Sequence, residues 1–274
     1  MRPPIETLHL FPLINEKLIS LLKQLSPGDW QKQTVAKQWV VKDVAAHLLD
    51  GNYRRIALNR DGWTGAPGNN FGSYEELVHY LNTMNADWVK AARRLSPAIL
   101  IELLESTNAI VYKEFSKLDP FTLAAYPVSW AGETKSYNWF DIAREYTERW
   151  LHQQQIRDAI NDNEIMTTEL YGPFLNIFMQ AWPYTMKEVN AEEGTVLKTT
   201  VTGIGEWYLK REQEEWKLEN NGEKTITAET IIDSEIAWKL FSKSIRKEDV
   251  NAGININGEQ SFGVKVLEMV SVMA

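Results

Sequence analysis

The first half of the chain carries apolar residues at the spacing of amphipathic helices. From Thr7 to Ala159 these residues recur at helical intervals with few β-branched alternations, and clusters of Pro, Gly and Asn divide the region into long segments. The pattern predicts a four-helix bundle. The first, second and fourth helices are expected over Leu8–Gln24, Val41–Asn59 and Tyr137–Ile160. The third is expected as a broken helix, which Ser96-Pro97 divides into Tyr74–Leu95 and Ala98–Leu118.

The pattern changes after Ile160, where the turn-rich run Asn161-Asp162-Asn163 predicts a domain boundary. We therefore expect the bundle over residues 1–162 and a smaller α+β domain over residues 163–274. Gly203-Ile204-Gly205 is too short for a phosphate-binding loop and is better explained as a turn between two strands. The predicted elements of this second domain are helices over Leu170–Val189, Ile236–Ser244 and Phe262–Met273, and strands over Thr195–Thr202, Gly205–Arg211, Lys224–Thr230 and Ala252–Ile256.

Composition and charge narrow the class of partner. A chain of 274 residues with 44% hydrophobic and 24% charged residues is typical of a soluble globular protein. The 29 Lys and Arg residues against 37 Asp and Glu residues give a net charge of −8, so we expect neither nucleic acid nor an anionic membrane as a partner. The chain also lacks a signal-peptide pattern and a long apolar run, which favours a cytoplasmic location. The oligomeric state is left open.

The chain contains no cysteine. This excludes disulfides, iron–sulfur clusters, thiolate zinc sites and a cysteine nucleophile. Any thiol chemistry must therefore use a thiol supplied from outside the protein.

The four histidines are His9, His47, His79 and His152, and two of them are candidate metal ligands. Glu148 and His152 are four residues apart on the last predicted bundle helix, which places both side chains on one face about 6 Å apart along the axis. His47, on the second predicted helix, could approach this pair across the bundle. Two histidines and one glutamate would leave coordination positions open for water or substrate, as a catalytic zinc ion requires.

Each of these residues also has an explanation without a metal. Glu148 lies four residues after Arg144, so an exposed salt bridge would account for it. His152 lies at the edge of the apolar stripe formed by Ile142, Tyr146, Trp150 and Ile156, and His47 has apolar neighbours, so both could be packing residues. Residue spacing alone favours these explanations. His79 has a polar helical face and is expected on the surface.

Two segments resemble the DinB-like superfamily, and within it the mycothiol-dependent maleylpyruvate isomerase group. They are Trp39–Leu48 (WVVKDVAAHL) and Glu145–Arg157 (EYTERWLHQQQIR). By this resemblance the metal ligands are His47, Glu148 and His152. The resemblance covers the bundle, and more faintly it extends to a C-terminal domain similar to the sterol-carrier-like α+β domain that follows the bundle in those isomerases.

The second predicted helix departs from the family pattern at its start. Relatives usually have Ser or Thr after the tryptophan, where this chain has Val40, so a hydroxyl cap worth about 1 kcal/mol is missing. Asp43 can offset part of this cost through the helix dipole. A hydrogen bond from Asp43 to the His47 ring is the less favoured alternative.

The resemblance implies a divalent metal, zinc in the first place with nickel or iron as alternatives, and an external low-molecular-weight thiol. It implies a small-molecule substrate and an isomerase or thiol-transferase activity. Arg149, Arg157, Lys210 and Arg211 are candidate clamps for a substrate carboxylate, although each is better explained as a solvated surface charge. Two other functions remain open: a non-catalytic protein that binds a small apolar ligand, and a metal-dependent hydrolase that needs no thiol.

Overall fold

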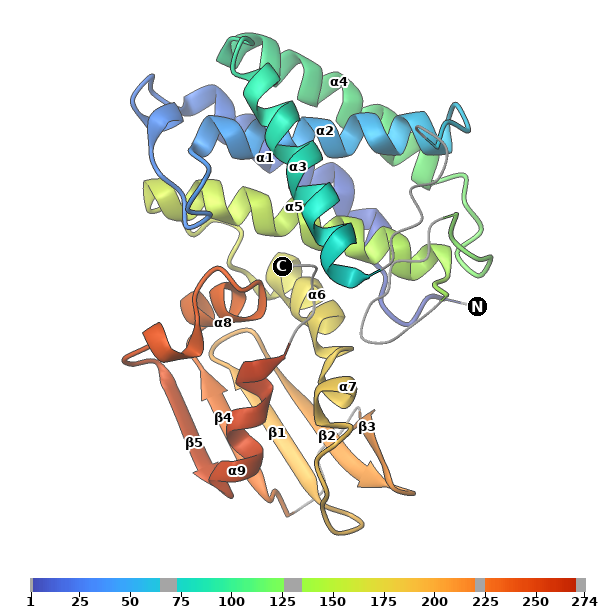
Figure 1. Cartoon of the computed structure of the whole chain (residues 1–274), viewed down its shortest axis with the longest axis vertical. Coiled ribbons are helices and arrows are strands. Elements are labelled where there is room, and N and C mark those ends of the chain that lie inside the picture. The colour runs from blue at the N-terminus through green and yellow to red at the C-terminus, as the bar shows by residue number, and fades with distance from the viewer. Residues whose placement is uncertain (1, 65–72, 126–134, 220–224, 270–274) are drawn as a thin grey trace. The chain divides into compact units, whose positions relative to one another are not determined.

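The structure is a computed structural model that describes residues 2–64, 73–125, 135–219 and 225–269 (Figure 1). Its contacts divide the chain into two compact units. Met1–Thr122 and Asn138–Glu164 form what we call the helical unit, and Leu123–Tyr137 and Ile165–Ala274 form the sheet unit.

The helical unit is built from long helices, as the apolar spacing predicts. Helix α2 contacts α3, α4 and α5, and α1 contacts α4 and α5. The core between them is apolar and includes Leu22, Val41, Leu49, Leu104 and Ile156. The helices are α1 (Phe11–Gln24), α2 (Val41–Asn59), α3 (Tyr74–Ala92), α4 (Pro97–Phe115) and α5 (Asn138–Ile160).

The predicted break at Ser96-Pro97 separates two helices. The Ser96 hydroxyl accepts a hydrogen bond from the backbone N–H of Ile99, and Pro97 occupies the first position of α4. Proline is favoured there because its missing N–H would have no partner in the first turn. Ser73 caps α3 in the same way through the N–H of Glu76. These caps explain why one predicted helix is two.

The start of α2 is stabilised without a hydroxyl cap. The Asp43 carboxylate accepts a hydrogen bond from the backbone N–H of Val40 at 3.3 Å and pairs with Arg93 at 3.0 Å. Asp43 therefore replaces the missing cap. The structure records no hydrogen bond from it to His47, in agreement with the favoured expectation.

The sheet unit contains a five-stranded sheet in the order β3-β2-β1-β4-β5. Strands β1 and β4 are parallel, and the other neighbours are antiparallel. Gly203, with φ +74°, lies in the turn between β1 and β2, as expected. The strands are β1 (Val196–Val201), β2 (Gly205–Glu212), β3 (Glu215–Glu219), β4 (Ala228–Ile232) and β5 (Ile254–Gly258). The predicted α+β fold class is confirmed.

Some predicted elements of this unit need correction. The expected helix Leu170–Val189 is divided into two helices, because the chain turns at Gln180 and Pro183 lies in the first turn of the second helix. The expected closing helix begins as a short helix and a 3₁₀ turn, and its last residues lie outside the described part of the chain. The observed helices are α6 (Thr168–Met179), α7 (Trp182–Met186), α8 (Ser234–Phe241) and α9 (Gln260–Gly263).

Strand β3 was not predicted from the sequence. It is short and mostly charged, with Trp216 as its one buried side chain. The turn before it places Gln213 and Glu214 at positive φ without the glycine or asparagine that usually marks such a hairpin. Strand β4 lies later than the predicted Lys224–Thr230, and Lys224 lies outside the described residues.

Among the helices described, none has the length and apolarity needed to span a membrane.

Candidate metal centre

The three predicted ligands come together inside the helical unit. His47 projects from α2, and Glu148 and His152 project from α5. One candidate ligand atom from each side chain lies within 4.8 Å of the other two. The two imidazole rings are 4.7 Å apart between centroids and nearly perpendicular. Residues separated by about a hundred positions in the sequence thus share one small volume of space.

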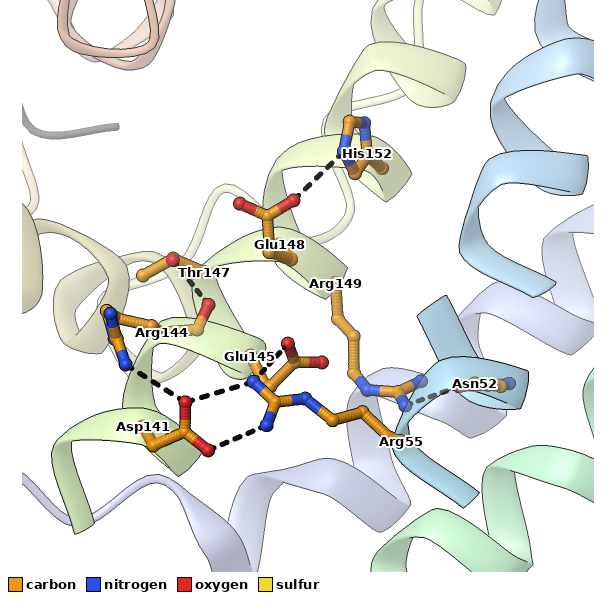
Figure 2. A network of polar contacts seen from close by, with 9 residues as sticks. All are labelled: Asn52, Arg55, Asp141, Arg144, Glu145, Thr147, Glu148, Arg149 and His152. Carbon is orange, nitrogen blue, oxygen red and sulfur yellow. Dashed lines mark hydrogen bonds and ion pairs between the residues drawn. The ribbon is translucent and has the colours of Figure 1, made fainter. Parts of the chain in front are cut away.

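Each ring nitrogen of His152 lies within hydrogen-bonding distance of a side-chain oxygen. Its Nδ1 lies 2.9 Å from Oε1 of Gln155, an amide oxygen to which this nitrogen donates in the tautomer with the proton on Nδ1. Its Nε2 lies 3.2 Å from Oε2 of Glu148 (Figure 2). In that tautomer Nε2 is unprotonated, so an unshared electron pair faces a carboxylate oxygen. Two acceptors facing each other require a proton or a cation between them.

His47 is almost fully buried, at 8% exposure. Its Nδ1 has no hydrogen-bond partner in the described part of the chain, and its ring lies 4.7 Å from the indole of Trp39. Burial lowers the pKa of His47 well below its usual value, and the neighbouring His152 and Arg54 act in the same direction. The ring is therefore held neutral, which is the form that binds metals.

The expected surface salt bridge between Arg144 and Glu148 is not formed. Arg144 pairs instead with Asp141 at 3.0 Å. The Glu148 side chain is 45% exposed and its carboxylate is directed to His152. The expectation of a packing residue at the edge of the apolar stripe accounts for the burial of His152 but not for its contact with Glu148. His79 is exposed, as expected.

Below this group, α5 carries a buried network of charged residues (Figure 2). Arg55 of α2 contacts Asp141 and Glu145 at 2.7 Å each. Against the effect of burial, these carboxylates raise the pKa of Arg55, and Arg55 lowers the pKa of Glu145. This network was not predicted from the sequence. The signal was present, because Asp141, Arg144, Glu145, Glu148 and His152 recur three or four residues apart and so share a face of the helix.

Arg149 lies in the core of the helical unit, contrary to the expectation of a solvated charge or a substrate clamp. It donates hydrogen bonds to Oδ1 atoms of amides on α1, α2 and α4, namely Asn15 at 3.1 Å, Asn52 at 2.6 Å and Asn108 at 2.8 Å. Burial lowers the pKa of Arg149 to about 10. A single guanidinium thereby connects four helices.

Arg157 is also buried, with no exposed surface. It pairs with Asp162 at 2.7 Å and Glu164 at 2.9 Å, after the end of α5. The sequence analysis expected a solvated charge, and this expectation was wrong. In the sheet unit, Arg211 stacks over the ring of Trp216.

Comparison with solved structures shows that the fold is a known one. Two crystal structures of the mycothiol-dependent maleylpyruvate isomerase, one of them of a mutant with a histidine changed to alanine, each match with a TM-score of 0.54. In both cases the match covers 92% of this chain and 92% of the other, at 12% sequence identity. No curated protein sequence matches the chain.

Comparison with family models agrees with the motifs in α2 and α5. The model of the mycothiol maleylpyruvate isomerase N-terminal domain matches residues 11–157, which is more than half of the chain. The matched range contains His47, Glu148 and His152, the helices α1 to α4 and α5 as far as Arg157. The resemblance seen in the sequence is thereby confirmed, and the chain belongs to the mycothiol maleylpyruvate isomerase N-terminal domain family.

Proposed function

We propose that the helical unit binds one divalent metal ion through His47, Glu148 and His152. The convergence of their ligand atoms within 4.8 Å carries this proposal. Two imidazole nitrogens and one carboxylate oxygen form a donor set that suits zinc, and nickel or iron as alternatives.

Two further observations support the fit. The buried Nδ1 of His47 lacks a hydrogen-bond partner in the described part of the chain, an arrangement that costs free energy unless another group compensates for it. In the tautomer of His152 with the proton on Nδ1, the lone pair of Nε2 faces the Glu148 carboxylate, and a cation bound by both atoms would relieve their repulsion. Gln155 holds the proton of His152 on the opposite nitrogen, which is the usual arrangement for a metal-binding histidine.

The proposed activity is the isomerisation of a maleylpyruvate-like substrate with the help of a low-molecular-weight thiol. When bound, the dication supplies the positive charge that favours the thiolate form of an added thiol at neutral pH. Thiolate addition to an activated double bond, rotation about the resulting single bond and thiolate elimination convert a cis into a trans compound and regenerate the thiol. The absence of cysteine means that the nucleophile has to come from outside the chain.

Metal analysis tests the proposed site. After growth with zinc and extensive dialysis, the wild type should retain about one equivalent per chain, whereas His47→Ala, Glu148→Gln and His152→Ala should retain much less. His79→Ala replaces an exposed histidine and should retain as much metal as the wild type. Equal metal in all five proteins would refute the site.

A thiol screen tests the reaction. Metal-loaded protein is incubated with maleylpyruvate in the presence of mycothiol, glutathione or no thiol, and the cis and trans products are separated by chromatography. We expect turnover only with a thiol, and only when the three ligands are intact. Hydrolysis of an ester or amide that proceeds equally well without thiol would favour the hydrolase instead.

A further inference from the structure

Arg144 lies on α5, one turn before Glu148. Residues four positions apart on a helix lie on the same face, so the guanidinium of Arg144 extends from the same side of α5 as the proposed metal ligand (Figure 2). Its side chain is only 8% exposed. It is thus a buried cation one helical turn from the proposed site.

The hydrogen-bonding capacity of this guanidinium is mostly unused. Its Nη2 donates to Oδ1 of Asp141 at 3.0 Å, but its Nε and Nη1 have no partner in the described part of the chain. Asp141 is shared, because Arg55 also donates to both of its oxygens, at 2.7 Å and 3.0 Å. A buried N–H group without an acceptor destabilises the folded protein, and more so when the group is charged.

The net charge of the buried network also indicates that an anionic acceptor is missing. Arg55, Arg144 and Arg149 contribute three positive charges and Asp141 and Glu145 two negative ones, and the remaining carboxylate, that of Glu148, is directed to His152 and assigned to the proposed metal. Arginine keeps its proton at neutral pH, so the network cannot remove the excess charge by releasing a proton. Burial disfavours the charged form of Arg144, and its pKa is lowered although Asp141 acts in the opposite direction. One additional singly charged anion would neutralise the network.

We propose that Arg144 binds a carboxylate of the substrate and so selects anionic substrates. A carboxylate brings the single negative charge and the acceptor oxygens that Nε and Nη1 lack, and guanidinium–carboxylate hydrogen bonds are among the strong ones in proteins. Because Arg144 lies one turn from Glu148 on the same face of α5, a substrate held by its carboxylate at Arg144 could extend along this face towards the proposed metal. This inference rests on the proposed function, because it assigns a residue to the substrate of that site.

The test measures binding of maleate to zinc-loaded protein by calorimetry, without any turnover. Loss of a charge-assisted hydrogen bond worth about 1.5–3 kcal/mol corresponds to a rise in Kd of roughly 10- to 100-fold, which we expect for Arg144→Met. Arg144→Lys keeps the charge but not the planar pair of donors and should give a smaller rise. Arg60→Met, which replaces an arginine with a 49% exposed side chain at the end of α2, is the matched control and should bind as the wild type does.

Zinc content is measured in the same samples, so that the two proposals can fail separately. Absent zinc would overturn the proposed metal site. Full zinc occupancy with no maleate binding in the wild type, or with a Kd for Arg144→Met within twofold of the wild type, would overturn the role of Arg144. If Arg144→Met does not fold, the same twofold criterion is applied to Arg144→Gln, which also removes the charge.

Discussion

Arg149 of α5 donates a 2.6 Å hydrogen bond to Oδ1 of Asn52 on α2, and this contact joins the two helices that carry the proposed ligands. His47 precedes Asn52 by five residues, and Glu148 and His152 flank Arg149. The buried guanidinium therefore fixes α5 against α2 close to the place where the imidazoles meet. Its contacts with Asn15 and Asn108 extend the same constraint to α1 and α4.

Replacement of Arg149 should affect both folding and metal binding. Arg149→Met leaves amide oxygens of Asn15 and Asn52 without their donor, so we expect a loss of at least about 2 kcal/mol in the free energy of unfolding. Zinc affinity of the folded variant should fall as well, because α5 is less well held against α2. Urea unfolding and competition with a chromogenic chelator measure the two effects. Lower stability with unchanged zinc affinity would show that Arg149 has no positioning role.

The metal-free protein should lose stability in mild acid through His47. Because the pKa of His47 is lowered on folding, the unfolded chain binds the extra proton first. The contribution of neutral His47 to the free energy of unfolding is therefore intact above pH 6.5 and declines as the pH falls below that value. The limiting slope is about 1.4 kcal/mol per pH unit, until the pH reaches the pKa of His47 in the folded protein. Urea unfolding between pH 5 and pH 8 measures the slope.

The control for this experiment is a matched histidine substitution. His47→Gln should make the pH dependence of the free energy of unfolding shallower, whereas His79→Gln, at an exposed position, should leave it as in the wild type. The prediction fails if the two variants give the same slope.

Gln155 should tune metal affinity through His152. In Gln155→Leu the Nδ1 proton loses its acceptor, and changes to such partners of metal-binding histidines reduce metal affinity by roughly 10- to 100-fold. Gln155→Glu keeps an acceptor oxygen and should retain most of the affinity. Chelator competition compares the two proteins, and equal affinity in Gln155→Leu and the wild type would contradict the role assigned to Gln155.

The sequence predicted α2 well because it has a regular apolar spacing and clear ends, and it predicted α5 within one residue of its start. It missed β3, whose turn lacks glycine and whose side chains are mostly charged. Spacing could place Glu148 and His152 on one face of a helix, but the approach of His47 depends on how α2 packs against α5. The family resemblance supplied that information.

The buried arginines were misjudged for a related reason. A single arginine is usually solvated, and only the tertiary structure shows that Arg149 is surrounded by three asparagines from separate helices. The asparagines themselves carry no recognisable motif, since they are far apart in the sequence. Arg157 depends in the same way on a chain reversal after α5 that brings Asp162 and Glu164 to it.

The contact between Trp39 and the imidazoles means that the fluorescence of Trp39 should report metal binding at the proposed site. The indole ring lies 4.7 Å from the His47 ring and 6.3 Å from the His152 ring, within the range at which paramagnetic ions quench tryptophan emission. Titration with Ni²⁺ or Co²⁺ should dim the protein's fluorescence, whereas Zn²⁺ should quench it little. Trp39→Phe should remove much of this quenching although ten other tryptophans remain. Occupancy of the centre could then be followed in real time without a label.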